Sequence, residues 1–268
     1  MIRHIEFDRL HNFRDVGGYV TADGRRVRWR RLYRSDSLGA LTGADAERFL
    51  RLGIRTVIDL RHPDEAEAQG RVPGRDGYRY HNLSVEQQPW DRAAYDPRAG
   101  LGRFFADHYR RVAEMGTAEL ADALRLIADA DNAPVVVHCA AGKDRTGVVT
   151  ALVLALLGVP HEDVIADYAL TDLAAEKFAR DWLARHPGEE IPWAGFGRAP
   201  AEAMRLFLTE LCAAHGSVRS YCRNALGIGD DLVERLRDHL LEDLGDGDRD
   251  RSLERSSPHA ATDGRLGE

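Results

Sequence analysis

A cysteine and an arginine, six positions apart, form the part of this sequence with the clearest chemical character. Cys139 follows an apolar run that ends in His138, and Arg145 closes a short loop rich in small residues. The amide groups of such a loop, together with a helix N-terminus, bind a tetrahedral dianion and stabilise a thiolate at its centre. The planar guanidinium of Arg145 can hold two phosphate oxygens. The spacing therefore predicts a Cys139 nucleophile that attacks a phosphoryl group.

The elements on either side of this loop make the prediction specific. Residues 134–138 have the pattern of a buried strand, and residues 148–157 are apolar all round, as in a buried helix. We expect the loop and its neighbours to bind the substrate phosphate through His138, Ala140, Ala141, Gly142, Lys143 and Thr146. The hydroxyl of Thr146 is also placed to donate to the thiolate. The alternative, a buried core cysteine beside an arginine in a surface turn, does not explain why strand, loop and helix coincide.

Strand and helix patterns alternate along the chain. Short segments typical of strands occur at 31–34, 54–60 and 78–83. Helical patterns occur at 41–53, 101–115, 118–130, 161–185, 200–214, 217–226 and 230–243. This alternation predicts an α/β fold with a central, mostly parallel sheet flanked by helices. We expect one catalytic domain over residues 1–244 and a disordered tail at 245–268, where large apolar side chains are almost absent.

Charge and composition argue against several classes of protein. The chain has 37 basic and 44 acidic residues, a net charge of −7, which disfavours a general binder of nucleic acid or anionic membranes. Its three cysteines form no C-x-x-C pair, so neither a disulfide framework nor a structural zinc site is expected. The longest apolar run, 148–157, is too short to span a bilayer, and the N-terminus lacks a signal-peptide pattern. We expect a cytoplasmic protein without stable membrane insertion; export without a signal peptide and the oligomeric state stay open.

The loop as a whole resembles a known signature. HCAAGKDRTG at 138–147 is similar to the loop of bacterial protein-tyrosine-phosphatase-like enzymes, the atypical dual-specificity group. Further motifs that resemble this family are NFRDVGG at 12–18, LYRS at 32–35, VIDLR at 57–61, VIADY at 164–168 and GSVRSY at 216–221, followed by Leu226-Gly227. The resemblance covers residues 10–243.

This resemblance implies a tyrosine-phosphatase-like fold and a cysteine-based phosphomonoester hydrolase. The implied substrates are phosphorylated proteins, through phosphotyrosine and also phosphoserine or phosphothreonine, with phosphoinositides as a further class. Attack by Cys139 would give a phosphocysteine intermediate, from which water releases phosphate. No metal or cofactor is needed, because the loop amides and Arg145 neutralise the phosphoryl charge.

Lys143 and Asp144 are the loop residues that bear on the class of substrate and on proton donation. Lys143 is one of only two lysines in the chain, and the K-D-R order is similar to loops of enzymes that act on phosphoinositides. We expect Lys143 at the rim of the pocket, in contact with substrate; the alternative is a solvated charge. Departure of the alkoxide or phenoxide needs a proton donor, for which Asp144 is the first candidate. Glu86 and Asp91 are the alternatives, because they follow strand 78–83, where relatives carry another candidate acid.

The remaining residues singled out by the motifs have structural interpretations. Buried charge pairs that hold the loop and strands are expected of Arg14, Asp15, Arg34, Asp59 and Arg61. Packing roles are expected of Tyr168, Cys212 and Cys222. Residues 161–200, with Trp182, Trp193 and Phe196, predict either a helical lid or a plain hydrophobic docking surface.

Two rival functions share the loop chemistry. One is a phosphatase of a small phosphate, such as an inositol polyphosphate or a sugar phosphate, because pocket depth is not visible in the sequence. The other is a non-catalytic phosphate-binding module without an acid, against which the intact Cys139 and Arg145 argue.

Overall fold

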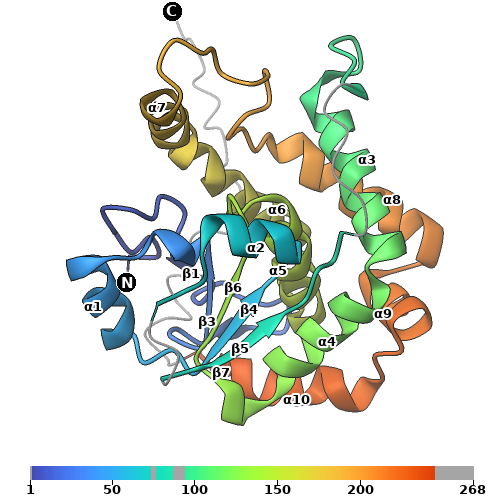
Figure 1. The fold of residues 1–268 in the computed structure, drawn as a ribbon. Helices are drawn as coiled ribbons and strands as arrows, with labels where there is room; N and C mark the ends of the chain where they lie inside the picture. The colour runs from blue at the N-terminus through green and yellow to red at the C-terminus, as the bar shows by residue number, and fades with distance from the viewer. Residues whose placement is uncertain (1, 74–76, 87–93, 245–268) are drawn as a thin grey trace, which may run out of the picture.

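A five-stranded sheet organises the computed structural model, which describes residues 2–73, 77–86 and 94–244. The strand order is β1-β3-β6-β4-β5 (Figure 1). The strands are β1 (Arg14–Asp15), β3 (Leu32–Ser35), β4 (Thr56–Asp59), β5 (Arg79–Asn82) and β6 (Val135–His138). β3, β6, β4 and β5 run parallel, and only the edge strand β1 is antiparallel to its neighbour. The predicted mostly parallel sheet is therefore confirmed.

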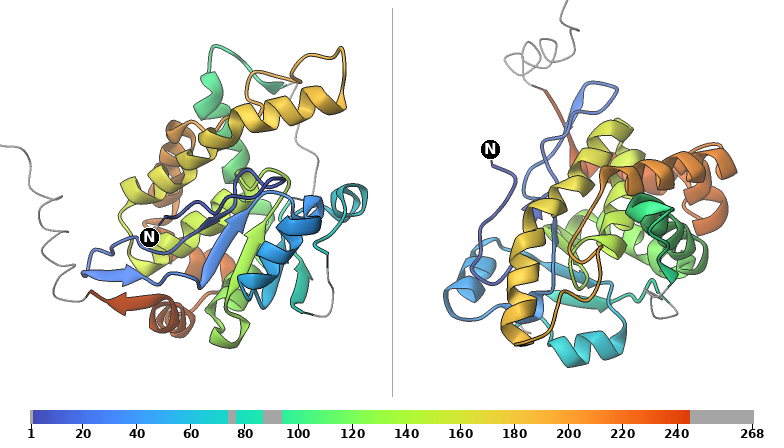
Figure 2. Two further views of the ribbon diagram at one scale, coloured as in Figure 1. Left: turned by 90° about the vertical axis from the view of Figure 1, so that its left-hand side faces the viewer. Right: turned by 90° about the horizontal axis from the view of Figure 1, so that it is seen from above.

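Helices cover both faces of this sheet (Figures 1 and 2). The α-helices are α1 (Gly43–Arg51), α2 (Pro63–Gln69), α3 (Gly100–Met115), α4 (Thr117–Ala128), α5 (Asp144–Leu157), α6 (His161–Ala169), α7 (Ala175–Arg185), α8 (Ala201–His215), α9 (Val218–Leu226) and α10 (Asp230–Leu240). Short 3-10 turns are η1 (Leu38–Ala40), η3 (Ala130–Asn132) and η4 (Leu170–Ala174). A separate two-stranded ribbon joins β2 (Arg25–Val27) to β7 (Leu241–Asp243).

The central strand β6 explains why both faces need cover. Successive side chains of a strand point to opposite faces, so Val135 and Val137 join the large core on one side while Val136 joins a smaller core on the other. The smaller core contains aromatic side chains of the N-terminal segment and α1, among them Phe13 and Phe49. An apolar strand buried on both faces is typical of parallel sheets.

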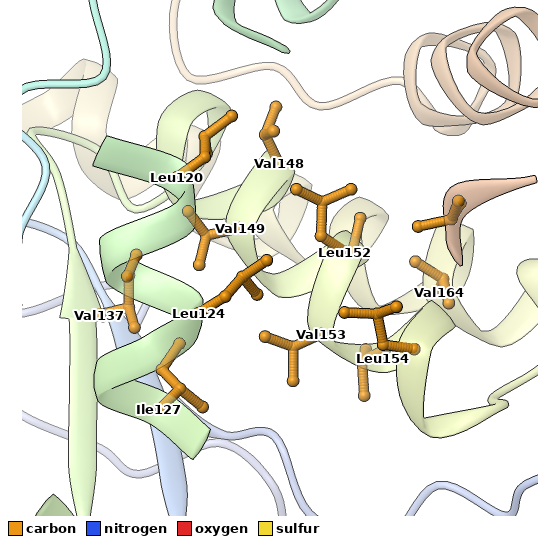
Figure 3. Packing of buried hydrophobic residues seen from close by; sticks show 14 of the residues in the cluster. Leu120, Leu124, Ile127, Val137, Val148, Val149, Leu152, Val153, Leu154 and Val164 are labelled. Carbon is orange, nitrogen blue, oxygen red and sulfur yellow. The ribbon is translucent and has the colours of Figure 1, made fainter. Parts of the chain in front are cut away.

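Helix α5 lies inside the large core, as its all-round apolar sequence predicts. Figure 3 shows Val148, Val149 and Leu152 of this helix among leucines of α4 and near Val137 of β6. Burying each such side chain contributes about 1.5–3 kcal/mol. The loop between β6 and α5 is thus anchored at both ends in the best-packed part of the molecule.

Several element boundaries differ from the sequence-based predictions. The single helix expected at 161–185 is divided into α6 and α7 by the turn η4, and the helix expected to reach 243 ends at Leu240, before β7. Helix α2 and strands β1, β2 and β7 were not predicted. The predicted tail at 245–268 lies outside the described residues. None of the helices in the described part of the chain is long and apolar enough to cross a bilayer.

Candidate active site

The loop between β6 and α5 lies at the carboxyl end of the parallel strands, where open α/β sheets usually bind ligands. Cys139 directly follows β6 and is only 2% exposed. Gly142 has φ +64°, and a Cβ there would lie 2.3 Å from the backbone oxygen of Ser35. The loop therefore passes so close to β3 that only glycine fits this position.

Side chains outside the loop hold its carbonyl groups. The Asn12 amide donates to the carbonyl oxygens of Ala141 at 2.8 Å and Gly142 at 3.1 Å. The Arg34 guanidinium donates to the Gly142 carbonyl at 2.8 Å. These bonds fix the orientation of the peptide planes, since each carbonyl points away from the amide of the next residue.

The amide groups of the loop, unlike its carbonyl groups, are not bound by other described parts of the protein. The Ala140 carbonyl accepts from the backbone amide of Ser37 at 3.0 Å, so the loop's carbonyl side is bound by protein. Among the residues that the structure describes, the amides of Ala140, Ala141 and Gly142 make no hydrogen bond. Unpaired amides on one side of a loop that enters a helix form an anion-binding concavity.

A buried ion cluster supports the loop from behind. Asp167 of α6 is 1% exposed and contacts Arg34 at 2.6 Å and Arg14 at 3.3 Å. Burial alone would raise the pKa of Asp167, but the two arginines lower it well below its usual value. Arg14 also donates to the side-chain oxygen of Asn12. The two arginines predicted as structural thus share one carboxylate and reach the loop directly or through Asn12.

Arg145 lies in the first turn of α5 with its guanidinium bound by carboxylates. It contacts Glu65 of α2 through two bonds, of 2.5 and 3.1 Å, and Glu86 at 3.4 Å. Burial alone would lower the pKa of Arg145, but the Cys139 sulfur, Glu65 and Glu86 raise it. Glu65 was not among the predicted site residues. The signal for it is weak, since it is the third residue of a short helix that begins at a proline.

Glu86, a predicted alternative acid, also belongs to this cluster. Its other oxygen lies 2.6 Å from Nε2 of His108 on α3, so the carboxylate bridges His108 and Arg145. Asp91, the second alternative, lies outside the described residues.

Asp144 is the first residue of α5 and is held by a tyrosine. The Tyr109 hydroxyl donates to Oδ1 of Asp144 at 2.7 Å, and the amine of Lys143 lies 3.4 Å from the same oxygen. The carboxylate is 15% exposed, so it is not sealed from a bound substrate. The structure thus places Asp144 next to the loop as the sequence predicts.

Lys143 is not exposed at the rim, so the alternative of a solvated charge is wrong, while the expected contact of Lys143 with substrate stays a prediction. The residue is 3% exposed, and its amine donates to the carbonyl of Arg198 at 2.9 Å and lies 3.7 Å from the centre of the Phe105 ring. Burial lowers its pKa, while Asp144 opposes that effect. Residues far from Lys143 in the sequence cover this amine. The position of Lys143 in the loop therefore does not predict its burial.

His138 and Thr146 are both completely buried. Nδ1 of His138 lies 3.3 Å from the Cys139 carbonyl oxygen, and Nε2 lies 3.6 Å from Asp59. Burial lowers the pKa of His138 to about 4, so the ring is neutral at physiological pH. Within the described part of the chain, the Thr146 hydroxyl has no hydrogen-bond partner, so the expected bond to the thiolate is not formed here.

The other structural predictions can be compared with their contacts. Arg61 and Asp59 form a fully buried ion pair at 2.6 Å. Asp15 instead accepts from two backbone amides, those of Gly17 and Arg30. Cys222 is buried and Cys212 partly buried, and both pack in or against the large core.

Residues 161–200 divide into a core part and an outer part. α6 is packed in the core, whereas α7 has no buried residue and stands above the sheet together with the start of α3 (Figure 1). Trp193 packs edge-on against Phe104 and Phe105 of α3. The loop at 187–198 leads from α7 towards α8, packs against α3 through Trp193 and ends at the carbonyl that binds Lys143.

No group of three or more candidate ligands for a metal ion occurs within residues 2–73, 77–86 and 94–244. The polar clusters described above consist of carboxylates paired with arginines, lysine, histidine or tyrosine.

Comparisons with known proteins agree on one family. A model of the tyrosine phosphatase family matches residues 5–242. A Cupriavidus necator protein named as a tyrosine-protein phosphatase is 33% identical over 258 residues, covering 89% of this chain and 89% of that protein. The triple specificity protein phosphatase PtpB of Mycobacterium tuberculosis is 33% identical over 272 residues, covering 86% and 96%.

Two solved structures are similar to this chain at lower sequence identity. P. aeruginosa TpbA in complex with pTyr is 17% identical with a TM-score of 0.31, covering 84% of this chain and 94% of that one. The Siw14 catalytic core is 14% identical with a TM-score of 0.34, covering 75% and 92%.

Proposed function

Because the chain belongs to the tyrosine phosphatase family, we propose that it hydrolyses phosphotyrosine through a phosphocysteine intermediate on Cys139. The observation that carries this proposal is the loop itself. Its carbonyls are bound from outside, its amides at Ala140, Ala141 and Gly142 make no bond among the described residues, and the buried Cys139 begins it. Such a concavity fits a phosphoryl group placed against the sulfur.

The first step forms the sulfur–phosphorus bond. The Cys139 thiolate attacks phosphorus, the bond to the leaving oxygen breaks with its electron pair, and a carboxyl group supplies the proton to that oxygen. Arg145 holds two phosphoryl oxygens while charge moves onto them. In the second step water attacks phosphorus, gives up a proton to the carboxylate and releases the thiolate.

We assign the proton transfer to Asp144. This carboxylate is next to the loop, partly exposed, and its described contacts reach only Oδ1. Glu86 touches Arg145 and His108, so we assign it to holding the guanidinium instead. The amine of Lys143 donates a hydrogen bond to the Arg198 carbonyl. This contact does not support the hydrolysis of phosphoinositides.

The substrate range is proposed from the relatives. The Mycobacterium tuberculosis relative is named a triple specificity protein phosphatase, which supports a range wider than phosphotyrosine. We propose phosphoserine and phosphothreonine as the further substrates. No contact in the described site favours a small sugar or inositol phosphate.

The test uses acid quenching and a matched cysteine control. Wild-type protein incubated with a radiolabelled phosphotyrosine peptide is expected to retain label after denaturation in acid, and Cys139→Ser is expected to lose both label and turnover. Cys212→Ser, which changes a partly buried cysteine elsewhere, should behave as wild type. Turnover by Cys139→Ser at the wild-type rate would refute the proposed nucleophile. Phosphate binding without turnover in wild type would favour a non-catalytic module.

A further inference from the structure

Two buried tyrosines connect the proposed acid to the core of the molecule. The Tyr109 hydroxyl, from α3, donates to Oδ1 of Asp144 at 2.7 Å. The Tyr168 hydroxyl, from α6, lies 2.6 Å from the Tyr109 hydroxyl. Since the hydrogen of Tyr109 goes to the carboxylate, the hydrogen between the tyrosines must come from Tyr168. The order of donation is therefore Tyr168 to Tyr109 to Asp144.

The rings of both tyrosines are fixed by packing. Tyr109 is fully buried, stacks on Phe105 and meets Phe207 edge-on. Tyr168 is 1% exposed, and a Cβ on Gly147 of α5 would lie 3.1 Å from its ring. The glycine after Thr146 thus leaves the space that Tyr168 occupies. Neither hydroxyl can swing away without disturbing the core.

Both hydroxyls remain donors over the working range of pH. Burial, with the nearby Asp144 carboxylate, raises the pKa of Tyr109 well above its usual value. Burial does the same for the pKa of Tyr168, again with a contribution from Asp144. A hydroxyl that stays protonated can hold one carboxyl oxygen of Asp144 in either of that residue's protonation states.

We propose that Tyr109 and Tyr168 are positioning residues for Asp144, which rests on the phosphatase function proposed above. In the described part of the chain, the hydrogen bond and the ion pair of Asp144 both reach Oδ1. Oδ2 then carries the proton that moves to the leaving oxygen as the phosphorus–oxygen bond breaks. In the second step the same oxygen accepts a proton from the attacking water. A displacement of about 1 Å in a positioned group can cost about 100-fold in rate.

The test exploits the dependence of proton donation on the leaving group. Phenyl phosphate releases a weakly acidic phenol and needs the acid, whereas p-nitrophenyl phosphate releases a far more acidic phenol and needs it little. Tyr109→Phe keeps the ring and removes the donor. We expect it to lower kcat/KM for phenyl phosphate by about 10- to 100-fold and for p-nitrophenyl phosphate by about threefold or less. Tyr168→Phe should show the same pattern with a smaller factor, and Asp144→Asn the same pattern with a larger one.

A third tyrosine supplies the matched control. Tyr221 is 2% exposed and its hydroxyl donates to the Ala113 carbonyl at 2.6 Å, so Tyr221→Phe also removes a buried hydrogen bond. It should change both substrates by one common factor. If Tyr109→Phe does the same while Asp144→Asn discriminates between the substrates, the positioning role is wrong. If Asp144→Asn fails to discriminate, the assigned acid is wrong and the positioning role falls with it. Activity retained by Cys139→Ser would instead overturn the phosphatase mechanism itself.

Discussion

Removing the charge of Asp167 should destabilise the molecule more than any surface charge change. Asp167→Asn is close to isosteric, so it deletes the charge while leaving the packing in place. Arg14 and Arg34, which are 2% and 1% exposed, then lose their shared carboxylate. Breaking a buried ion pair by removing one partner costs about 3–5 kcal/mol, because the remaining charge is buried without compensation.

The expected cost converts into a measurable shift. For a domain of 150–250 residues each kcal/mol lowers Tm by about 2–4 °C, so Asp167→Asn should lower Tm by about 6–20 °C. Urea unfolding should give a free energy lower by about 3–5 kcal/mol with an unchanged m-value. Because Arg34 also binds the Gly142 carbonyl, kcat/KM for phosphotyrosine should fall as well.

The pH dependence provides an independent check with a definite sign. The folded-state pKa of Asp167 is lowered, so its contribution is fully present above its unfolded value and is lost as pH falls through the folded value. The difference between wild type and Asp167→Asn should therefore be constant between about pH 5 and pH 8 and should narrow only in stronger acid.

An exposed aspartate gives the comparison that can refute this reasoning. Asp230 contacts Arg219 and Arg223 but is 54% exposed, so solvent screens its charge and Asp230→Asn should lower the free energy of unfolding far less than Asp167→Asn. If Asp167→Asn costs no more than Asp230→Asn, the buried cluster does not stabilise the fold by the mechanism described.

Two further changes test the loop. Gly142→Ala places a Cβ 2.3 Å from a backbone oxygen, so it should lower kcat/KM by about tenfold or more. The control is Gly53→Ala, because Gly53 also has a positive φ, +65°, but its Cβ would meet nothing within 4 Å. Gly53→Ala should leave kcat/KM unchanged and lower the free energy of unfolding, measured by urea titration, by only about 1–2 kcal/mol. Lys143→Met should speed hydrogen exchange in residues 187–198, because it removes the bond to the Arg198 carbonyl. It should lower the turnover of phosphotyrosine, and of any phosphoinositide that wild type hydrolyses, by one common factor, with Lys177→Met as control. A loss confined to phosphoinositide would show that the amine reaches substrate.

The loop at 138–147 and the central sheet could be predicted because their signals are local. Three consecutive valines before Cys139 indicate a strand buried on both faces, and the apolar run after Thr146 indicates a buried helix. Both elements lie where the sequence predicts them, although α5 begins at Asp144 rather than at 148. A loop between two such elements is fixed by them, so its position follows from the pattern.

Helix α2 was missed because its signals are ambiguous. Pro63 suggests a loop, yet proline suits the first turn of a helix, where its missing amide is not needed. The cap is His62, whose ring accepts from the Asp64 amide while Glu65 accepts from the His62 amide. These two bonds form a capping box, the usual N-terminal signal of a helix. Histidine is not a usual residue at the cap position, so the sequence does not show this signal. Without this helix the sequence does not predict Glu65 as a site residue, although Glu65 binds Arg145, which lies 80 positions further along the chain.

Helix α3 shows how a face that looks like plain core can also serve the site. The sequence places Phe105, His108 and Tyr109 on one side of a helix, since residues three and four apart share a face. In the structure these three side chains meet three different charged groups: Phe105 meets Lys143, His108 meets Glu86, and Tyr109 meets Asp144. Aromatic spacing alone predicts burial and nothing more. The partners come from segments brought together only by the fold, so the polar use of this face depends on tertiary contacts that no local pattern contains.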